Sequence, residues 1–220
     1  MSRSLRALGL GLLAILITGA VMASVVMAES SFKFKTEVAT TKLTGKQHAS
    51  NDVFTTHTGT SSCDEINYVG EQVGSEVNEV TLTPSFVHCK AFGLFTVPIE
   101  VNGCAYRFKT GTKTGSNYAG IVDIVCPNGK VIEIKAPGCT VTIGSQSSVG
   151  AIQYTNIGTT TTREVTMDFN ILNIKYEEHR PFFGICSTNT MPTTGGTYSG
   201  AAVVTGENPV STAHRGFFVQ

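Results

Sequence analysis

The sequence has no tryptophan, few charged residues and no net charge. Charged side chains make up 15% of its 220 residues, with 16 basic against 16 acidic, so no basic surface for nucleic acid is expected. It has no C-x-x-C pair, H-E-x-x-H helix, P-loop or G-x-S-x-G elbow. The sequence therefore contains no signature of a metal, cofactor or catalytic site, and the missing tryptophan removes the commonest platform for stacking sugars.

The first 28 residues have the three parts of a secretory signal. Arg3 and Arg6 form a basic start, an apolar stretch runs from Leu8 to Val21, and small residues follow. Cleavage after Ala28 fits best, and cleavage after Ala23 is the alternative. An uncleaved anchor is a second alternative, because the apolar run approaches the roughly 20 residues that span a bilayer. We expect residues 1–28 to be a signal peptide and 29–220 to form one secreted, extracytoplasmic domain.

The six cysteines all lie in the predicted exported part, and an even number in an oxidising compartment indicates three disulfides. Fifteen connectivities are open. The strand pattern below pairs Cys104 with Cys126. Cys89 could then reach Cys63, which leaves Cys139 for Cys186. None of the eleven asparagines lies in an N-x-Ser/Thr sequon, a feature more typical of a bacterial than of a eukaryotic secretory protein.

Alternating apolar residues predict a β-meander over residues 95–135. Val97, Ile99 and Val101 alternate, Asn102-Gly103 supplies a type I′ turn, and Cys104, Tyr106 and Phe108 alternate back. In the register that places the apolar side chains on one face, with Val125 and Val131 as exceptions, Tyr106 opposes Ile124, Phe108 opposes Val122, and Ile124 opposes Ile132. Arg107 then lies opposite Asp123 on the other face.

Weaker strand patterns continue through the rest of the chain. They cover 32–38, 53–58, 77–83, 139–143, 152–154, 165–176 with a β-bulge after Ile171, 198–205 and 216–219. One short helix is predicted after Thr83-Pro84, with Phe86, Cys89 and Phe92 at three-residue spacing before Gly93. About ten short strands without alternating helices favour a sandwich or a barrel. We expect an all-β, antiparallel, β-sandwich-like domain with three disulfides.

Candidate chemical groups are sparse. The histidines His48, His57, His88, His179 and His214 have no metal-ligand spacing. His88 precedes Cys89, but adjacent side chains point apart, and Cys89 is expected to be oxidised. Glu177, Glu178 and His179 could bind a cation or a sugar, although a charged run that leaves a strand is usually a solvated loop.

The carboxylates offer only weak site hypotheses. Asp123 and Glu133 are the single pair that the register places side by side, as a glycoside hydrolase requires, but Arg107 beside them favours a surface ion cluster. Calcium could bind acidic residues that lack the EF-hand spacing. These are Asp64, Glu65, Glu71 and Glu76, and the tyrosines that could replace tryptophan in sugar stacking are Tyr68, Tyr106, Tyr118, Tyr154 and Tyr198.

Four short stretches resemble a family of secreted bacterial proteins with no known activity. They are Thr83-Pro84 to Cys89, Asn102-Gly103-Cys104-Ala105-Tyr106, Val125-Cys126-Pro127-Asn128-Gly129 and Gly195-Gly196-Thr197-Tyr198-Ser199-Gly200. The resemblance covers most of the exported chain, implies an extracytoplasmic location, and carries over no functional residue.

The function that we expect is a non-catalytic binding or envelope-structural module. Its partner would be an extracellular glycan or a cell-surface protein, met through loops at 68–79, 110–120 and 177–184. No nucleic acid, no cofactor, no metal and no membrane beyond the signal segment is expected. The alternative is a secreted, glycan-directed hydrolase with an unrecognised site.

Overall fold

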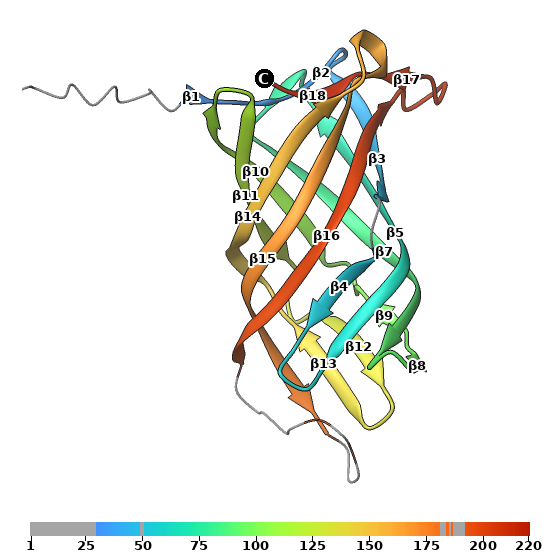
Figure 1. Cartoon of the computed structure of the whole chain (residues 1–220). Helices are drawn as coiled ribbons and strands as arrows, with labels where there is room; N and C mark the ends of the chain where they lie inside the picture. The colour runs from blue at the N-terminus through green and yellow to red at the C-terminus, as the bar shows by residue number, and fades with distance from the viewer. Residues whose placement is uncertain (1–29, 49–50, 181–183, 185, 187–191) are drawn as a thin grey trace, which may run out of the picture.

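Eight antiparallel strands close into a β-barrel in the computed structural model, which describes residues 30–48, 51–180, 184, 186 and 192–220 (Figure 1). Each strand pairs with the next along the chain, and the last pairs back with the first. The barrel strands are β3 (Thr40–Gln47), β5 (Thr60–Val73), β7 (Glu79–Ala91), β10 (Ala105–Thr114), β11 (Asn117–Val125), β14 (Gln146–Ile157), β15 (Glu164–His179) and β16 (Thr193–Glu207).

Side-chain alternation explains which residues fill the barrel, because successive residues of a strand face opposite sides. On β15, Val165, Met167 and Phe169 are buried while the residues between them face outward. The register shifts between Ile171 and Ile174, which confirms the β-bulge predicted there. Because of that shift, Leu172 is 53% exposed.

An aromatic cluster fills the upper end of the barrel. Phe34 stacks on Phe217 with ring centroids 5.9 Å apart, and it meets Tyr154 edge to face at 5.2 Å. Phe32 and Tyr118 extend the same cluster. The short elements at this end are β1 (Ser30–Ser31), β2 (Phe34–Thr36), β6 (Glu76–Val77), η1 (Thr160–Thr162), β17 (His214–Arg215) and β18 (Phe217–Val219), and β18-β2-β6 form a small separate sheet (Figure 1).

The lower end is extended by a hairpin that leaves the barrel. β12 (Ile132–Ala136) and β13 (Cys139–Ile143) pair with each other, β13 pairs with the end of β15, and β12 pairs with β9 (Ile99–Glu100). β4 (Asp52–Thr55) lies between β5 and β16, and β8 (Phe95–Thr96) pairs with β7 (Figure 1). None of the described residues forms a helix of the length and hydrophobicity needed to span a bilayer.

The all-β prediction is confirmed, but the sandwich is wrong. Alternation looks the same in a sandwich and in a small barrel, since both bury one face of every strand. What distinguishes them is the pairing of β16 with β3, which joins residues such as Val204 and Gly45. That contact spans most of the chain, so no local pattern predicts it.

The predicted helix after Thr83 is also wrong, because the segment lies inside β7. His88 has φ of 50°, which marks a kink in the strand between Phe86 and Cys89. The kink changes the inward-facing spacing from two residues to three, and this imitates a helical period. Proline has no backbone N–H to donate to a neighbouring strand. Pro84 is tolerated because β10 pairs with β7 only as far as Leu82, so no β10 residue pairs with the proline.

The predicted meander is right only in its middle pairing, that of residues 104–108 with 122–126. Tyr106 pairs with Ile124, Phe108 with Val122, and Arg107 with Asp123. Asn102 and Gly103 have the positive φ angles of the predicted turn, at 50° and 83°. However, Ile99 pairs with Ile134 of β12 instead of with β10, and the neighbour of β11 is β14. The predicted pairing of Ile124 with Ile132 is therefore wrong.

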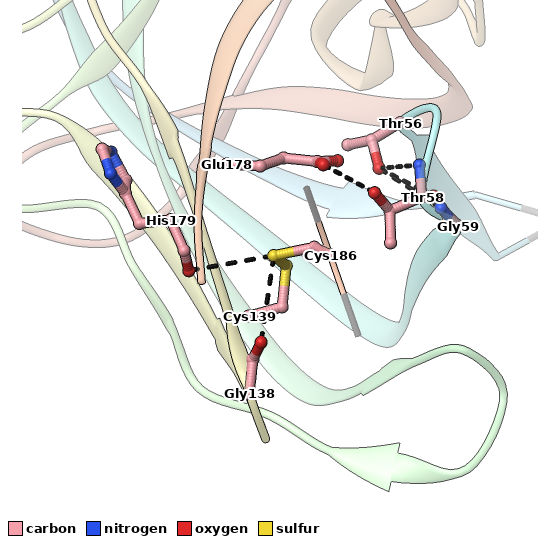
Figure 2. Close-up of a disulfide and its surroundings, with 8 residues drawn as sticks. All are labelled: Thr56, Thr58, Gly59, Gly138, Cys139, Glu178, His179 and Cys186. Atoms are coloured by element: carbon pink, nitrogen blue, oxygen red, sulfur yellow. Dashed lines mark hydrogen bonds between the residues drawn. A yellow bond between two sulfur atoms is a disulfide. The ribbon is translucent and has the colours of Figure 1, made fainter. Parts of the chain in front are cut away.

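Three disulfides connect the strands, in the pairing that the sequence suggested. Cys63–Cys89 joins directly opposed residues of β5 and β7, and Cys104–Cys126 links the start of β10 to the end of β11. Cys139–Cys186 ties β13 to the segment after β15 (Figure 2). This content is typical of an oxidising, extracytoplasmic location. The predicted signal segment, residues 1–28, lies outside the described residues.

Candidate functional site

An apolar cavity occupies the lower half of the barrel. Its volume is about 50 Å³, space for about one or two water molecules. The lining is aliphatic or aromatic at every position, and it comes from the barrel and from the β12–β13 hairpin. Its aromatic members are Phe54, Phe86, Tyr106, Phe108, Phe169 and Tyr198.

The cavity approaches the surface between β7, β9 and β10. Only three of its lining residues, Phe86, Ile99 and Tyr106, are half-buried, and the others are buried. Tyr106 forms the last pairing of β10 with β7, opposite Leu82, and Phe86 lies beyond that pairing on β7. The three half-buried side chains are therefore the part of the lining nearest to solvent.

A buried carboxyl group lies next to the lining residues Phe54 and Tyr198, just outside the cavity wall. Asp52 is 2% exposed and lies two residues before Phe54 on the inward face of β4. Neither carboxylate oxygen completes a well-aligned hydrogen bond with the described part of the chain. Burial raises the pKa of Asp52 to about 7, while the Tyr198 hydroxyl and the Ala201 backbone N–H act in the opposite direction.

Gly200 makes room for this carboxyl group. A Cβ atom at position 200 would lie within bonding distance of Asp52 Oδ1, so any larger residue would collide with the acid. Position 200 is two residues beyond Tyr198, which pairs with Phe54 across β16 and β4. Asp52 is thus packed against β16, beside the lining residues Phe54 and Tyr198.

Three tyrosines surround the acid and form a polar belt with it, defined here as Asp52, Tyr68, Tyr106 and Tyr198. The hydroxyl oxygens of Tyr68 and Tyr198 are 3.2 Å apart and share a hydrogen bond. Burial raises the pKa of each of the three tyrosines. The hydroxyls consequently stay protonated and serve as hydrogen-bonding groups, and Asp52 is the one group of the belt that titrates near neutral pH.

The sequence predicted the tyrosines as sugar-stacking residues, and the structure places them differently. Tyr68, Tyr154 and Tyr198 are buried in the barrel, whereas Tyr106 and Tyr118 are half-buried. Asp52 was not predicted as a site residue. A signal for it exists, because Asp52 and Phe54 alternate, which places an acid on the same face as a core aromatic residue.

The structure separates the other predicted site residues. All five histidines are exposed, and no group of three or more histidines, cysteines or acids among the described residues is placed to hold a metal ion. The predicted calcium ligands Asp64, Glu65, Glu71 and Glu76 are exposed on β5 and β6, and Glu76 pairs with Lys35 at 2.8 Å.

Glu177, Glu178 and His179 do not act as one cluster, since they alternate across β15. Glu178 is fully buried and accepts a hydrogen bond from the Thr58 hydroxyl at 2.6 Å. His179 is exposed and lies 3.4 Å from Glu177. Figure 2 shows the side chains of Glu178 and His179 on opposite sides of the strand.

Asp123 and Glu133 are not neighbours, which corrects the predicted carboxylate pair. Asp123 forms ion pairs with Arg107 at 2.7 Å and Lys109 at 2.6 Å, while Glu133 pairs with Lys135 at 3.1 Å. Burial raises the pKa of Asp123, but hydrogen bonds from Lys109, the Ser148 backbone and Arg107 outweigh it and hold the pKa at about 2. Asp123 is therefore a structural ion-pair member.

The predicted binding loops are mostly strand. Residues 68–79 include the end of β5, residues 110–120 are the β10–β11 hairpin, and 177–179 belong to β15. A shallow groove does exist elsewhere on the outer surface, with a volume of about 760 Å³. Its lining is rich in hydroxyl and amide groups, including Ser147, Ser148, Asn170 and Asn173.

Comparison with known proteins gives no match: neither a protein-family model, nor a curated protein, nor a solved structure is similar to this chain.

Proposed function

We propose that this protein is a secreted, non-catalytic binding module that holds a small, mainly apolar molecule inside its barrel. The observation that carries the proposal is the apolar cavity bordered by the polar belt. Small-molecule sites generally combine an apolar lining with a few convergent polar groups. The free space of about 50 Å³ is a third of the engineered cavity of about 150 Å³ that holds benzene, so a molecule as long as n-butanol requires the half-buried side chains to move.

A binding role is supported over a hydrolytic one by the acids available. A glycoside hydrolase uses two carboxyl groups about 5–9.5 Å apart. Among the described residues, the buried acids are Asp52, Asp123 and Glu178. Asp123 is held by two cations and Glu178 by Thr58, and neither lines the cavity. Asp52 thus has no second carboxyl group in the site.

The test is a titration of the purified protein, with disulfides intact, with n-butanol, followed by NMR of its methyl groups. Methyl signals of cavity residues Val122 and Ile134 should shift saturably, while those of the exposed residues Leu172 and Val210 should not. Equal shifts at all four positions, or none, would overturn the proposal.

Two variants make the test specific to the cavity. Val122→Phe fills the space and should abolish binding, whereas Ile124→Ala enlarges it and should strengthen binding. Together they keep the test decisive if one of them fails to fold. Binding that is unchanged in both would place the ligand elsewhere.

A glycan partner is the second candidate, favoured by the outer groove near Ser148 and Asn173. Its uncharged hydroxyl and amide groups match the hydrogen-bonding groups of a sugar. A glycan screen of the same protein tests it. Saturable binding that Asn173→Ala and Asn170→Ala remove would support this candidate, and a negative screen of the folded protein would reject it.

A further inference from the structure

We propose that the molecule held in the barrel carries an ammonium group, which pairs with Asp52. This inference rests on the proposed function and names the chemical class of its ligand: a small primary amine with an apolar tail. Three independent features of the barrel interior support it.

The first feature is the unsatisfied carboxyl group. Both oxygens of Asp52 are buried, and the nearby Tyr198 hydroxyl and Ala201 backbone N–H give neither oxygen a well-aligned hydrogen bond. Buried polar atoms without partners are rare in folded proteins, and each needs an explanation. An ammonium group has three donors and no acceptor, so it can satisfy both oxygens of one carboxylate.

The second feature is the sign of the buried charge. Among the acidic and basic residues of the described part of the chain, those that are buried are Asp52, Asp123 and Glu178, and no lysine, arginine or histidine is buried. An anionic ligand beside Asp52 would meet repulsion without a compensating cation. A cationic ligand would neutralise the carboxylate.

The third feature is the aromatic lining. Six of the cavity's side chains are aromatic, and the rings of Phe169 and Tyr198 are 5.7 Å apart near the acid. The negative faces of aromatic rings attract cations, and sites for ammonium ligands are commonly built from such rings. Asp52 lies at the end of this aromatic lining, where Phe54 and Tyr198 oppose each other.

The size of the cavity limits the rest of the ligand. About 50 Å³ accommodates a few heavy atoms. The half-buried side chains Phe86, Ile99 and Tyr106 are the ones that can move to admit a longer chain. An unbranched amine of four carbons is therefore a suitable probe.

The experiment compares n-butylamine, n-butanol and butyrate, which share one shape and differ in charge. At pH 8, methyl NMR titrations should give butylamine a dissociation constant at least tenfold lower than that of butanol, with no binding of butyrate. Equal or tighter binding of butanol would overturn the ammonium assignment while leaving the proposed function intact. Failure of all three probes to bind would contradict both.

Asp52→Asn tests the residue itself. The substitution keeps the size of the side chain and removes its charge, so butylamine should lose its advantage over butanol. Glu178→Gln is the matched control, because it changes another fully buried carboxyl group, one that accepts a hydrogen bond from Thr58 and lies outside the polar belt. This variant should keep the advantage. A preference that survives in Asp52→Asn, or disappears in Glu178→Gln, would overturn the assignment.

The pH dependence of butylamine binding tests the same pairing on the wild-type protein. The ionisable groups that face Asp52 are Tyr68 from β5, Tyr106 from β10 and Tyr198 from β16, and all three stay neutral below pH 8. Butylamine should therefore bind more tightly at pH 8 than at pH 6, as Asp52 ionises, while butanol should not. Affinity for butylamine that is independent of pH would count against the pairing.

Discussion

At the scale of single residues, Asp52 and Asp123 are both aspartates with almost no exposed surface, yet their surroundings shift the carboxyl pKa in opposite directions. Asp123 receives two cations and a backbone N–H, so it stays ionised. Asp52 has only tyrosine hydroxyls and backbone near it, so burial dominates and favours its neutral form. Ionisation of Asp52 is therefore coupled to the stability of the barrel.

Asp52 should make the protein less stable as the pH rises from about 4 to about 7. Its pKa is about 7 in the folded protein and 3.8 without the fold, so the folded state binds a proton that the unfolded state has lost. The free energy of unfolding should fall across this window by up to about 4 kcal/mol and then level off. Urea unfolding of the wild type and Asp52→Asn at pH 4, 5, 6 and 8 measures the difference.

The variant should lack this contribution and be more stable than the wild type at pH 8. Asp168→Asn is the control, since Asp168 is an exposed residue of β15 and its substitution should leave the pH profile unchanged. If Asp52→Asn and the wild type lose stability in parallel over this range, the Asp52 carboxyl group is not buried as described.

At the scale of elements, β4 and β16 illustrate how two segments far apart in the sequence constrain each other. β4 inserts the Asp52 side chain against β16 at the position of Gly200. The glycine is required here by close approach and not by its backbone angles, because its φ is not in the left-handed region. The two residues should consequently behave as a coupled pair.

Gly200→Ala should destabilise the protein by about 2 kcal/mol or more, because the new methyl group collides with Asp52. Adding Asp52→Ala should recover much of the lost stability, so the effects of the two substitutions on the free energy of unfolding should be strongly non-additive. Chemical unfolding of the wild type, both single variants and the double variant gives the coupling energy.

Gly144→Ala is the control, since a Cβ atom there would meet only Val131, at 3.9 Å, and stability should change little. Simple additivity in the Gly200→Ala and Asp52→Ala cycle would show that the two residues do not compete for space.

At the scale of the whole molecule, the barrel is held by strand pairing and by three disulfides placed mainly toward its lower end. The pairing of β16 with β3 closes the barrel wall. The Cys139–Cys186 disulfide links the β12–β13 hairpin to the chain after β15 (Figure 2). The closed loops span sequence separations of 22, 26 and 47 residues. By chain entropy, each should stabilise the fold by about 3–4 kcal/mol.

Reduction with dithiothreitol should therefore lower the melting temperature substantially. Calorimetry of the oxidised and fully reduced protein, with free thiols counted after each scan, makes the comparison. An unchanged melting temperature in fully reduced protein would show that the disulfides are dispensable for stability.

The sequence by itself determined the all-β class, the turn at Asn102-Gly103, the pairing of Tyr106 with Ile124 and of Arg107 with Asp123, and the Cys104–Cys126 disulfide. These depend on alternation and turn chemistry between nearby segments, which local residue order encodes. The helix error at Pro84 has a local cause too, since a kinked strand and a short helix share the same apolar spacing.

Only the tertiary structure decided that the strands close into a barrel, that β9 crosses to β12, and that Asp52 meets Tyr198 beside an apolar cavity. Each of these depends on contacts between segments far apart in the chain, such as β4 with β16 and β3 with β16. Closure and shear are properties of all eight strands together. The candidate site is assembled by that closure, because its acid, its tyrosines and its aromatic lining come from different strands.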